Sequence, residues 1–413
     1  MLSAPKALRL HIGIFGRRNV GKSSLLNAIT RQQVSIVSAF AGTTTDPVEK
    51  PMELLPLGPV LFVDTAGIDD EGALGELLMA RTRAVLDLVD LGIVVTEAGA
   101  WGPFEEGLAS ELDRRKVPVI VVVNKTDQAP LGDDECAWLA RRAAAVVDAA
   151  AISGHGVASL REALIRLAPA DFFDNRRVIA DLVPPGEVAV LVVPIDKEAP
   201  KGRLILPQVM AIRDLLDGES LALVTQEREL RAALSRLTRP PALVVTDSQA
   251  FLKVAADVPP DVPMTSFSIL MARFQGDLHE QVRGTLGLER LKAGDRVLVA
   301  ETCTHHPIGD DIGRVKIPRW LTQYVGAALE FVHVQGRDFP ADLSPFAVVV
   351  HCGNCTGNRR EMLSRIGRCR DAGVPITNYG LTIAYSLGIF ERALVPFPGA
   401  LDAYRAAAAG PPR

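Results

Sequence analysis

The chain has 413 residues, of which 48% are hydrophobic and 23% are charged, and its formal net charge is −4. This length exceeds what one hydrophobic core organises, so about two to four domains are expected. The apolar segments are too short to span a bilayer, and the acidic balance without a run of Lys or Arg argues against a dedicated nucleic-acid binder. No apolar core of signal-peptide length precedes the first strand, so a cytoplasmic location is expected.

The first predicted domain, residues 1–171, alternates short apolar strands with helical patterns. This alternation is typical of a doubly wound α/β domain with a largely parallel sheet. The predicted strands are Leu10–Phe15, Val60–Val63, Leu91–Thr96 and Val117–Val123, and the predicted helices are Ser23–Thr30, Leu77–Val89, Phe104–Lys116 and Trp138–Val147.

A phosphate-binding loop is predicted between the first strand and the first helix. Residues 16–23, Gly-Arg-Arg-Asn-Val-Gly-Lys-Ser, match the pattern G-x-x-x-x-G-K-[ST], although a purely structural loop is an alternative for this motif alone. Backbone N–H groups of such a loop bind phosphates, Lys22 is expected to reach the β- and γ-phosphates, and Ser23 is expected to bind Mg²⁺. The residues expected at the nucleotide are Gly16, Asn19, Val20, Gly21, Lys22, Ser23 and Ser24.

Two further motifs follow predicted strand ends and specify the nucleotide. Asp64-Thr65-Ala66-Gly67 stands where a carboxylate near Mg²⁺ and a backbone amide near the γ-phosphate are needed. In Asn124-Lys125-Thr126-Asp127, the Asp127 carboxylate can accept two hydrogen bonds from guanine that adenine cannot donate. Ser153 and Gly154 lie where a loop would close on the base. GTP and GDP are therefore the predicted ligands.

Two more α/β domains are predicted after a linker at residues 172–185. The middle domain, residues 186–262, contains no residue set with recognisable chemistry, so a structural or association role is expected. The last domain covers residues 263–413. Its predicted strands are Thr265–Ile269, Arg296–Ala300, Leu329–Val334, Phe346–His351 and Val374–Thr377.

Three of the five cysteines follow two strands of the last domain. Cys303 begins Cys-Thr-His two residues after the run Arg296–Glu301. Cys352 directly follows the run Ala347–His351 and forms the motif His-Cys-Gly-Asn-Cys with Cys355. Because ligands gather beyond the carboxyl ends of parallel strands, we expect one shared site. A structural zinc with three thiolates and one histidine, a redox dithiol, and an iron–sulfur cluster all remain open.

The fourth ligand of such a site is not specified by the sequence. Glu301, His305 and His351 are candidates, and His306 is a more remote one; each histidine could equally donate a hydrogen bond to the site. Tyr379 and Gly380 follow another strand end, where both core packing and a place beside the same crevice are open.

The nucleotide motifs, together with Gly42-Thr43-Thr44-Thr45-Asp46, resemble those of Era/TrmE-type GTPases. The resemblance implies that Thr44 is a Mg²⁺ ligand in switch I and that Asn19 binds K⁺, as in potassium-activated members. Ile68 stands where a glutamine could orient water, so slow hydrolysis is expected. Arg17 and Arg18 could supply charge instead of K⁺, but solvated surface is the simpler interpretation.

The whole chain, with its Era-like motifs, plain middle domain and C-x-H…H-C-x-x-C pattern, resembles the [FeFe]-hydrogenase maturation GTPases. The resemblance implies a [4Fe–4S] cluster on Cys303, Cys352 and Cys355. It also implies that a di-iron precursor of the hydrogenase active site binds transiently. Two radical-SAM maturases would load the precursor, the apo-[FeFe]-hydrogenase would receive it, and the middle domain would form a homodimer or tetramer. An Era-like RNA- or ribosome-associated GTPase with a structural zinc site is the alternative.

Overall fold

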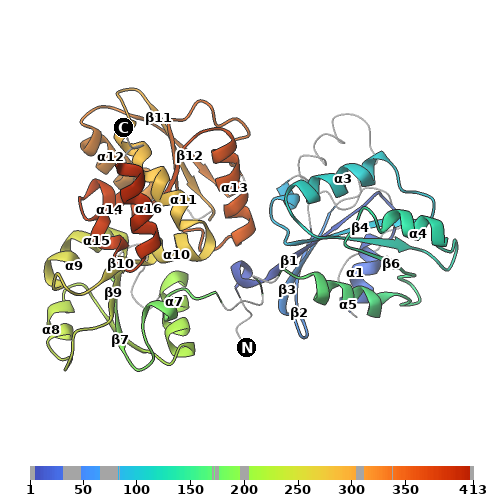
Figure 1. The fold of residues 1–413 in the computed structure, drawn as a ribbon, viewed down its shortest axis with the longest axis horizontal. Coiled ribbons are helices and arrows are strands. Elements are labelled where there is room, and N and C mark those ends of the chain that lie inside the picture. Colours follow the sequence, from blue (N-terminus) through green and yellow to red (C-terminus); the bar gives the residue numbers. More distant parts are fainter. Residues whose placement is uncertain are drawn as a thin grey trace. The chain divides into compact units, whose positions relative to one another are not determined.

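The computed structural model describes residues 5–30, 48–65, 82, 84–169, 172, 176–195, 204–303, 311–336 and 338–409. The chain separates into two compact units, Met1–Asn175 and Arg176–Arg413, which are described one at a time (Figure 1). Within these described ranges, no helix has both the length and the apolar character needed to cross a membrane.

The first unit is built on a six-stranded sheet with the order β2-β3-β1-β4-β5-β6. Strand β2 runs antiparallel to β3, and the other neighbouring strands are parallel. The strands are β1 (Leu10–Phe15), β2 (Val48–Leu54), β3 (Gly58–Asp64), β4 (Leu91–Glu97), β5 (Val119–Asn124) and β6 (Ala145–Asp148). The helices are α1 (Lys22–Thr30), α3 (Pro103–Arg114), α4 (Asp133–Leu139) and α5 (Val157–Leu167).

Two apolar clusters cover the two faces of this sheet. Alternate residues of each strand point to opposite faces, so Ile12 and Ile14 of β1 pack with α1 and α5, whereas Phe15 packs with α3. The sheet is therefore buried on both sides, and the loops at its carboxyl edge are held on a rigid base.

One sequence-based prediction for this unit is wrong, and one strand is missed. The pattern over Trp138–Val147 is not one helix, because α4 ends at Leu139 and the β-branched Val146 and Val147 pair with β5 as part of β6. Strand β2 is not predicted at all: it contains Pro51, which a sheet tolerates only at an edge. The helix predicted over Leu77–Val89 falls largely outside the described residues.

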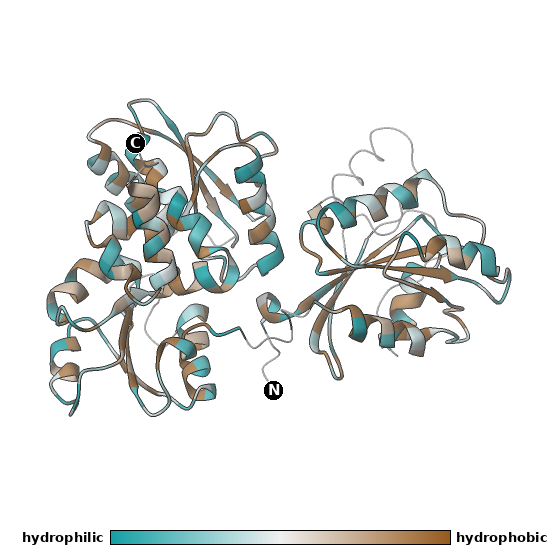
Figure 2. Ribbon diagram, in the orientation of Figure 1, coloured by the Kyte–Doolittle hydropathy of each residue, from teal (hydrophilic) through white to brown (hydrophobic). Residues whose placement is uncertain are grey.

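The second unit contains two four-stranded sheets whose neighbouring strands are all parallel. The middle sheet has the order β10-β9-β7-β8, with β7 (Val188–Val192), β8 (Leu221–Thr225), β9 (Leu243–Thr246) and β10 (Met264–Ser266). The cysteine-bearing sheet has the order β12-β11-β13-β14, with β11 (Arg296–Glu301), β12 (Glu330–Gln335), β13 (Val348–His351) and β14 (Ile376–Asn378). Figure 2 shows that the strands are mainly hydrophobic, as expected for sheets covered on both faces.

Helices connect and cover the strands of both sheets. Those that follow the strands of the middle sheet are α7 (Leu206–Asp217), α8 (Leu230–Leu234), α9 (Phe251–Asp257) and α10 (Phe267–Gln275). The remaining helices are α11 (Leu278–Thr285), α12 (Ile317–Val325), α13 (Arg359–Asp371), α14 (Tyr379–Ser386), α15 (Phe390–Leu394) and α16 (Pro398–Ala408). The predicted fold class, an α/β chain with largely parallel sheets, is confirmed.

Two boundaries in this unit differ from the sequence-based picture. The strand predicted at Thr265–Ile269 ends at Ser266, whose side chain accepts a hydrogen bond from the Ile269 N–H (3.2 Å) and so begins α10. Part of the segment predicted as a linker is folded, because Ile179 and Ala180 are buried and their N–H groups donate to Asp214 of α7 (2.7 and 2.8 Å).

Candidate nucleotide and cluster sites

The predicted phosphate-binding loop joins β1 to α1. Its two end glycines have positive φ, 145° at Gly16 and 92° at Gly21. A Cβ at Gly16 would collide with the Val95 carbonyl oxygen, and one at Gly21 would collide with the Asn124 side chain. Both positions therefore require glycine. Asn19, between them, is left-handed (φ 62°) and exposed.

The side chain of Lys22 is buried within this loop. Its Nζ donates hydrogen bonds to the carbonyl oxygens of Gly16 (2.9 Å) and Arg17 (2.6 Å). The ammonium group is thus held at the loop by backbone oxygens, which is where phosphate oxygens bind in loops of this type. Val20 is buried in the core, and Ser24 lies in the first turn of α1.

The Mg²⁺ site predicted at Ser23 and Asp64 has a fitting donor set. The Ser23 hydroxyl donates to Asp64 Oδ2 (2.8 Å), and burial raises the pKa of the Asp64 carboxyl. The other carboxylate oxygen, Oδ1, is buried and has no hydrogen-bond partner among the described residues. Mg²⁺ prefers such oxygen ligands. Thr44, predicted as a Mg²⁺ ligand, and Gly67, predicted beside the γ-phosphate, lie outside the described residues.

Asn124, at the end of β5, connects the phosphate-binding loop to the loop that follows β6. Its Nδ2 donates to the Val20 carbonyl oxygen (2.8 Å), and its Oδ1 accepts from the Ala151 N–H (3.1 Å). Because both ends of the amide are used and the side chain is buried, it holds the two loops at a fixed separation. The next residue, Lys125, is left-handed and its Nζ contacts Glu97 (2.6 Å).

An open groove of about 470 Å³ lies beside the residues predicted to bind guanine. Asp127 and Ser153 both line it, and Gly154 continues the same loop with φ 80°. The Ser153 hydroxyl donates to the Ala150 carbonyl oxygen (3.1 Å), which stabilises the turn in the loop after β6. The carboxylate that is predicted to accept hydrogen bonds from guanine therefore lines this groove.

Arg17 does not project freely into solvent. Its guanidinium makes two hydrogen bonds to the buried carboxylate of Glu105 in α3 (2.8 and 3.1 Å). A bidentate pair of this kind fixes the orientation of the side chain. The structure thus gives Arg17 a packing partner within the first unit.

The cysteine motifs come together at the carboxyl edge of the second sheet of unit two. Strands β11 and β13 are neighbours, with Ala300 opposite His351, and the Cys352 N–H donates to the Ala300 carbonyl oxygen (2.9 Å). The Thr302 N–H also donates to Cys352 Sγ (3.3 Å). In the order β12-β11-β13-β14, the connections change direction between β11 and β13, which is where sheets of this type bind ligands.

The three thiols influence one another electrostatically. Burial raises the pKa of Cys303 to about 12, with contributions from the nearby Cys352, Cys355 and Glu301. Burial and Cys352 raise the pKa of Cys355 to about 11. Bound metal favours the thiolate forms that this environment otherwise disfavours. Among the described residues, however, no three Cys, His, Asp or Glu side chains converge closely enough for a single metal ion.

The candidates for the fourth ligand differ in what already contacts them. Glu301 is 6% exposed; its Oε1 accepts from the Tyr379 hydroxyl (3.1 Å) and its Oε2 from Gln335 Nε2 (3.1 Å). Each carboxylate oxygen has a second lone pair that can still bind a metal. His305 and His306 lie outside the described residues.

His351 uses both ring nitrogens within the protein. Its Nδ1 donates to the Cys352 carbonyl oxygen (2.8 Å), and its Nε2 accepts from Arg365 (2.8 Å). Burial and the Arg365 charge lower the pKa of His351 to about 3, so the ring is neutral. A neutral ring with both nitrogens engaged holds the turn that carries Cys352 and leaves no nitrogen for a metal.

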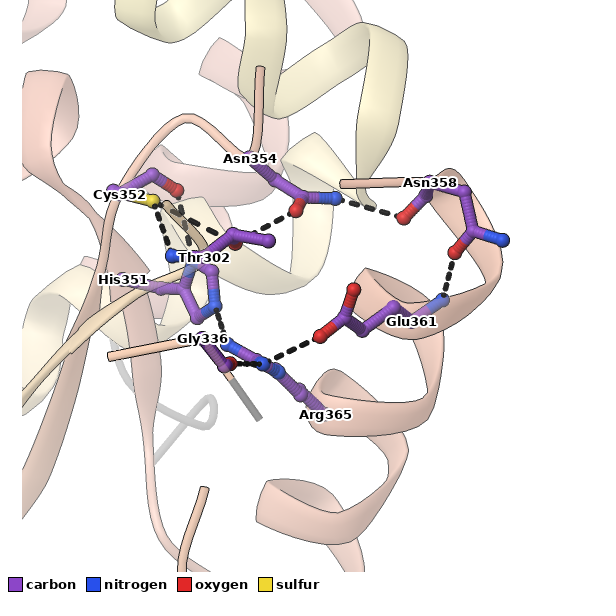
Figure 3. A network of polar contacts seen from close by, with 8 residues as sticks. All are labelled: Thr302, Gly336, His351, Cys352, Asn354, Asn358, Glu361 and Arg365. Carbon is purple, nitrogen blue, oxygen red and sulfur yellow. Dashed lines mark hydrogen bonds and ion pairs between the residues drawn. The ribbon is translucent and has the colours of Figure 1, made fainter. Parts of the chain in front are cut away.

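A polar network continues from His351 into α13 (Figure 3). Arg365 also donates to Glu361 (2.6 Å) and to the Gly336 carbonyl oxygen (2.5 Å). The sequence analysis does not identify Arg365. The available signal is its position on the buried face of α13, which is otherwise formed by Met362, Ile366 and Cys369. An arginine on an apolar helix face needs a buried partner.

The turn between Cys352 and Cys355 is held from the other side. Asn354 is left-handed (φ 54°), its Oδ1 accepts from the Thr302 hydroxyl (2.7 Å), and its Nδ2 donates to the Asn358 carbonyl oxygen (2.8 Å). The loop after β11 is thereby tied to the loop after β13, as Figure 3 shows.

Three family models match the chain in sequence order. The model described as 50S ribosome-binding GTPase matches residues 11–125. The Hydrogen maturase F dimerization domain matches residues 178–276, and the Hydrogen maturase F tetramerization domain matches residues 279–396.

The curated relatives share the first unit. GTPase Der of Wolinella succinogenes is 41% identical over 128 residues, which cover 30% of this chain and 27% of that protein. GTPase Der of Campylobacter jejuni is 34% identical over 170 residues, covering 38% and 36%. The chain thus spans only about a quarter to a third of the length of these relatives.

Solved structures of Era also align with the chain. Era in complex with MgGDPNP and nucleotides of 16S ribosomal RNA is 20% identical, with a TM-score of 0.36, over 52% of this chain and 91% of that one. Aquifex aeolicus Era bound to GDP and AlF₄⁻ is 19% identical, with a TM-score of 0.36, over 60% and 99%.

The matches agree with the site geometry in both units. The first unit is a GTPase domain, and its fold supports binding of GTP or GDP with Mg²⁺. The dimerization and tetramerization models cover most of the second unit and support self-association. The chain therefore belongs to the [FeFe]-hydrogenase maturation GTPases, the hydrogen maturase F family.

Proposed function

We propose that this protein is a GTP-regulated scaffold that binds a [4Fe–4S] cluster through Cys303, Cys352 and Cys355. Its cargo is the di-iron precursor of the [FeFe]-hydrogenase active site. Two radical-SAM maturases load the precursor, and the apo-[FeFe]-hydrogenase receives it. The observation that carries the proposal is the register of β11 against β13. It sets the ends of the two strands that precede the cysteines side by side, at the point where the order of the strands reverses.

The spacing of the thiols supports a cluster rather than a structural zinc ion. A zinc site needs four ligands at about 2.0–2.3 Å from one atom, so three thiolates would have to converge closely. Among the described side chains no such convergence exists, although the charges of Cys352 and Cys355 both act on Cys303. In a cluster each cysteine binds a different iron, so the sulfurs stand farther apart. A three-cysteine cluster also keeps one iron with an exchangeable position, which suits a carrier.

The candidates for that exchangeable position are Glu301 and His305. Support for Glu301 comes from its place at the end of β11, two residues before Cys303, and from the lone pairs that its carboxylate retains. A weakly held protein ligand at this position would yield to the incoming di-iron precursor without breaking the thiolate bonds.

The nucleotide cycle regulates partner binding in this proposal. GTP changes the affinity for the maturases, because a nucleotide can shift an equilibrium only through different affinities for two states. Hydrolysis is slow, because Ile68 replaces the water-orienting glutamine, and K⁺ bound near the exposed Asn19 accelerates it.

Self-association through the middle domain has support at one edge of its sheet. Strand β8 is the last strand in the order β10-β9-β7-β8, so one side of its backbone has no neighbouring strand among the described residues. Its Leu221 and Val224 are 55% and 44% exposed. An exposed apolar edge strand is a template for pairing with a second chain. We therefore place the dimer contact at β8.

Anaerobic purification tests the cluster directly. The full chain should carry iron and sulfide and show a broad thiolate-to-iron absorption, and the reduced protein should give the electron paramagnetic resonance signal of a [4Fe–4S] cluster. A colourless chain that contains zinc after anaerobic purification and iron reconstitution would overturn the proposal and favour an Era-like GTPase with a structural metal.

The regulatory step has its own test. Binding of each purified maturase to the full chain is measured with GTP, GDP and no nucleotide. We expect affinities that differ between the GTP and GDP forms. Equal affinities in all three forms would remove the nucleotide from the loading step while leaving the cluster proposal in place.

A further inference from the structure

Residues from three separate segments surround the carboxylate of Glu301. Gln335 ends β12 and stands opposite Glu301 in the register with β11. Tyr379 begins α14 after β14, and Gly313 belongs to the π-helical turn Ile312–Lys316. The segments come from different parts of the sequence, yet all three meet at one side chain beside the thiols.

The two hydrogen bonds to this carboxylate come from opposite sides. Tyr379, itself 7% exposed, donates from its hydroxyl to Oε1, and Gln335 donates from Nε2 to Oε2. The Gly336 N–H donates to the Glu301 main-chain oxygen (2.8 Å), which fixes the backbone as well. A carboxylate bound at both oxygens has little freedom to rotate.

The residues around the Glu301 carboxylate are closely packed. A Cβ at Gly313 would stand 2.8 Å from Glu301 Oε1 and would collide with the Tyr379 hydroxyl. Tyr379 is held in turn by Asn378, which caps α14 by accepting from the Gly380 N–H (2.8 Å) and also accepts from the Ser268 hydroxyl (2.9 Å). The donor to Glu301 is therefore fixed by the start of its helix.

We propose that Tyr379 and Gln335 are positioning residues that hold the Glu301 carboxylate beside the three thiolates and set how readily an outside ligand replaces it. This inference rests on the proposed function, since it needs a cluster with one exchangeable iron. Mutation of a hydrogen-bond partner that orients a metal ligand typically lowers the affinity for the metal by about 10–100-fold. When one of these two donors is removed, Glu301 competes less well with an outside ligand for the iron.

Imidazole titration of the cluster-loaded full chain tests this inference. Binding is followed by the electron paramagnetic resonance spectrum of the reduced cluster, with iron content measured in each sample. We expect Y379F to lower the imidazole concentration at half-saturation by about tenfold. The E301A variant should have the lowest imidazole concentration at half-saturation. Adding Y379F to E301A should not lower that concentration further.

The matched control is Y385F. Tyr385 lies on the same helix, and its hydroxyl contacts Glu289 rather than Glu301, so its removal should leave the titration unchanged. Gln335→Leu removes the donor to the other oxygen and should act in the same direction as Y379F. If the Y379F variant assembles no cluster, the Gln335→Leu variant still tests the inference.

Three results would overturn the inference. Y379F and Gln335→Leu could both titrate like the unaltered chain, the Y379F effect could persist in E301A, or E301A itself could have no effect. In each case the iron content would still support the proposed cluster. An unaltered chain that binds no iron would instead overturn the proposed function.

Discussion

The two sheets of the second unit have the same strand topology but different residues at the carboxyl ends of their strands. In both, the first strand in sequence lies between the second and the third, and every neighbouring pair is parallel. The strands of the middle sheet end at Val192, Thr225, Thr246 and Ser266, whereas those of the cysteine-bearing sheet end at Glu301, Gln335, His351 and Asn378. The shared topology provides a crevice twice, and only the residues placed at one of the two provide chemistry.

The plain sheet nevertheless supports the other one. Ser268, in the helix that follows β10, donates to Asn378 at the end of β14, and α10 packs against α14. The middle sheet therefore helps to orient the start of α14, and with it Tyr379. A difference in chemistry between the two sheets is not a difference in importance.

The largest expected effect is on metal content and is confined to one sheet edge. Changing Cys303 to Ala removes one of three proposed iron ligands, so we expect at least a roughly tenfold loss of bound iron and of the thiolate-to-iron absorption. Metal analysis after anaerobic reconstitution measures this. Cys136→Ala, in α4 of the first unit, is the control because Cys136 is also half-buried, and it should retain all the iron. A Cys303 variant that retains all of its iron would contradict the proposed role of Cys303 as a ligand.

Removing Arg365 should unfold the cysteine-bearing sheet preferentially. Arg365→Met leaves the Glu361 charge and the His351 Nε2 atom without their buried partner, which costs about 3–5 kcal/mol of the free energy of unfolding. Amide hydrogen exchange in β13, compared with β9 of the middle sheet, measures the local effect. Arg370→Met, on the exposed face of the same helix, should change stability by less than about 0.5 kcal/mol. Equal losses for the two variants would contradict the role of the network.

The two sheets should also respond differently to acid. The pKa of His351 is about 3 in the folded cluster-free chain, against about 6.5 when unfolded. The unfolded state therefore binds the proton more readily, so stability is complete above pH 6.5 and falls as the pH drops from 6.5 toward 3, by about 3 kcal/mol at pH 4.

Hydrogen exchange in β13 across this pH range measures the loss of stability. Strand β9 ends at Thr246, which does not titrate, so its amides should be affected less. His351→Gln keeps a hydrogen-bonding side chain and should remove the extra pH dependence of β13. A variant that retains the full pH dependence would assign the effect to another group.

The smallest expected effect concerns how closely α11 approaches β14. A Cβ at Gly284 would collide with the Ile376 carbonyl oxygen, so Gly284→Ala should destabilise the unit by about 1–3 kcal/mol. Gly367→Ala, within α13, meets only the flexible Arg370 side chain at 3.9 Å and should be neutral or stabilise by up to about 1 kcal/mol. Urea midpoints of the two variants provide the measurement. Equal midpoints would show that α11 can shift away from β14.

Most of the parallel strands could be predicted from the sequence because runs of valine, isoleucine and leucine mark strands buried on both faces. The same rule fails where the apolar residues are helical. Phe267, Ile269, Leu270 and Met271 are all buried in α10, and only the Ser266 cap distinguishes this segment from a strand. That the two cysteine motifs come together was predictable because each follows a parallel strand, and parallel strands end at the same edge of a sheet. The contacts of Tyr379, Gln335 and Arg365 were not, because each depends on packing between segments far apart in sequence.

The amide of Asn124 has a consequence for phosphate ligands that carry no base. It donates to the Val20 carbonyl oxygen of the phosphate-binding loop and accepts from the Ala151 N–H of the loop beside the guanine groove. One side chain therefore positions both loops. Even inorganic pyrophosphate, which never touches the guanine groove, would then meet a looser loop once that single side chain is shortened.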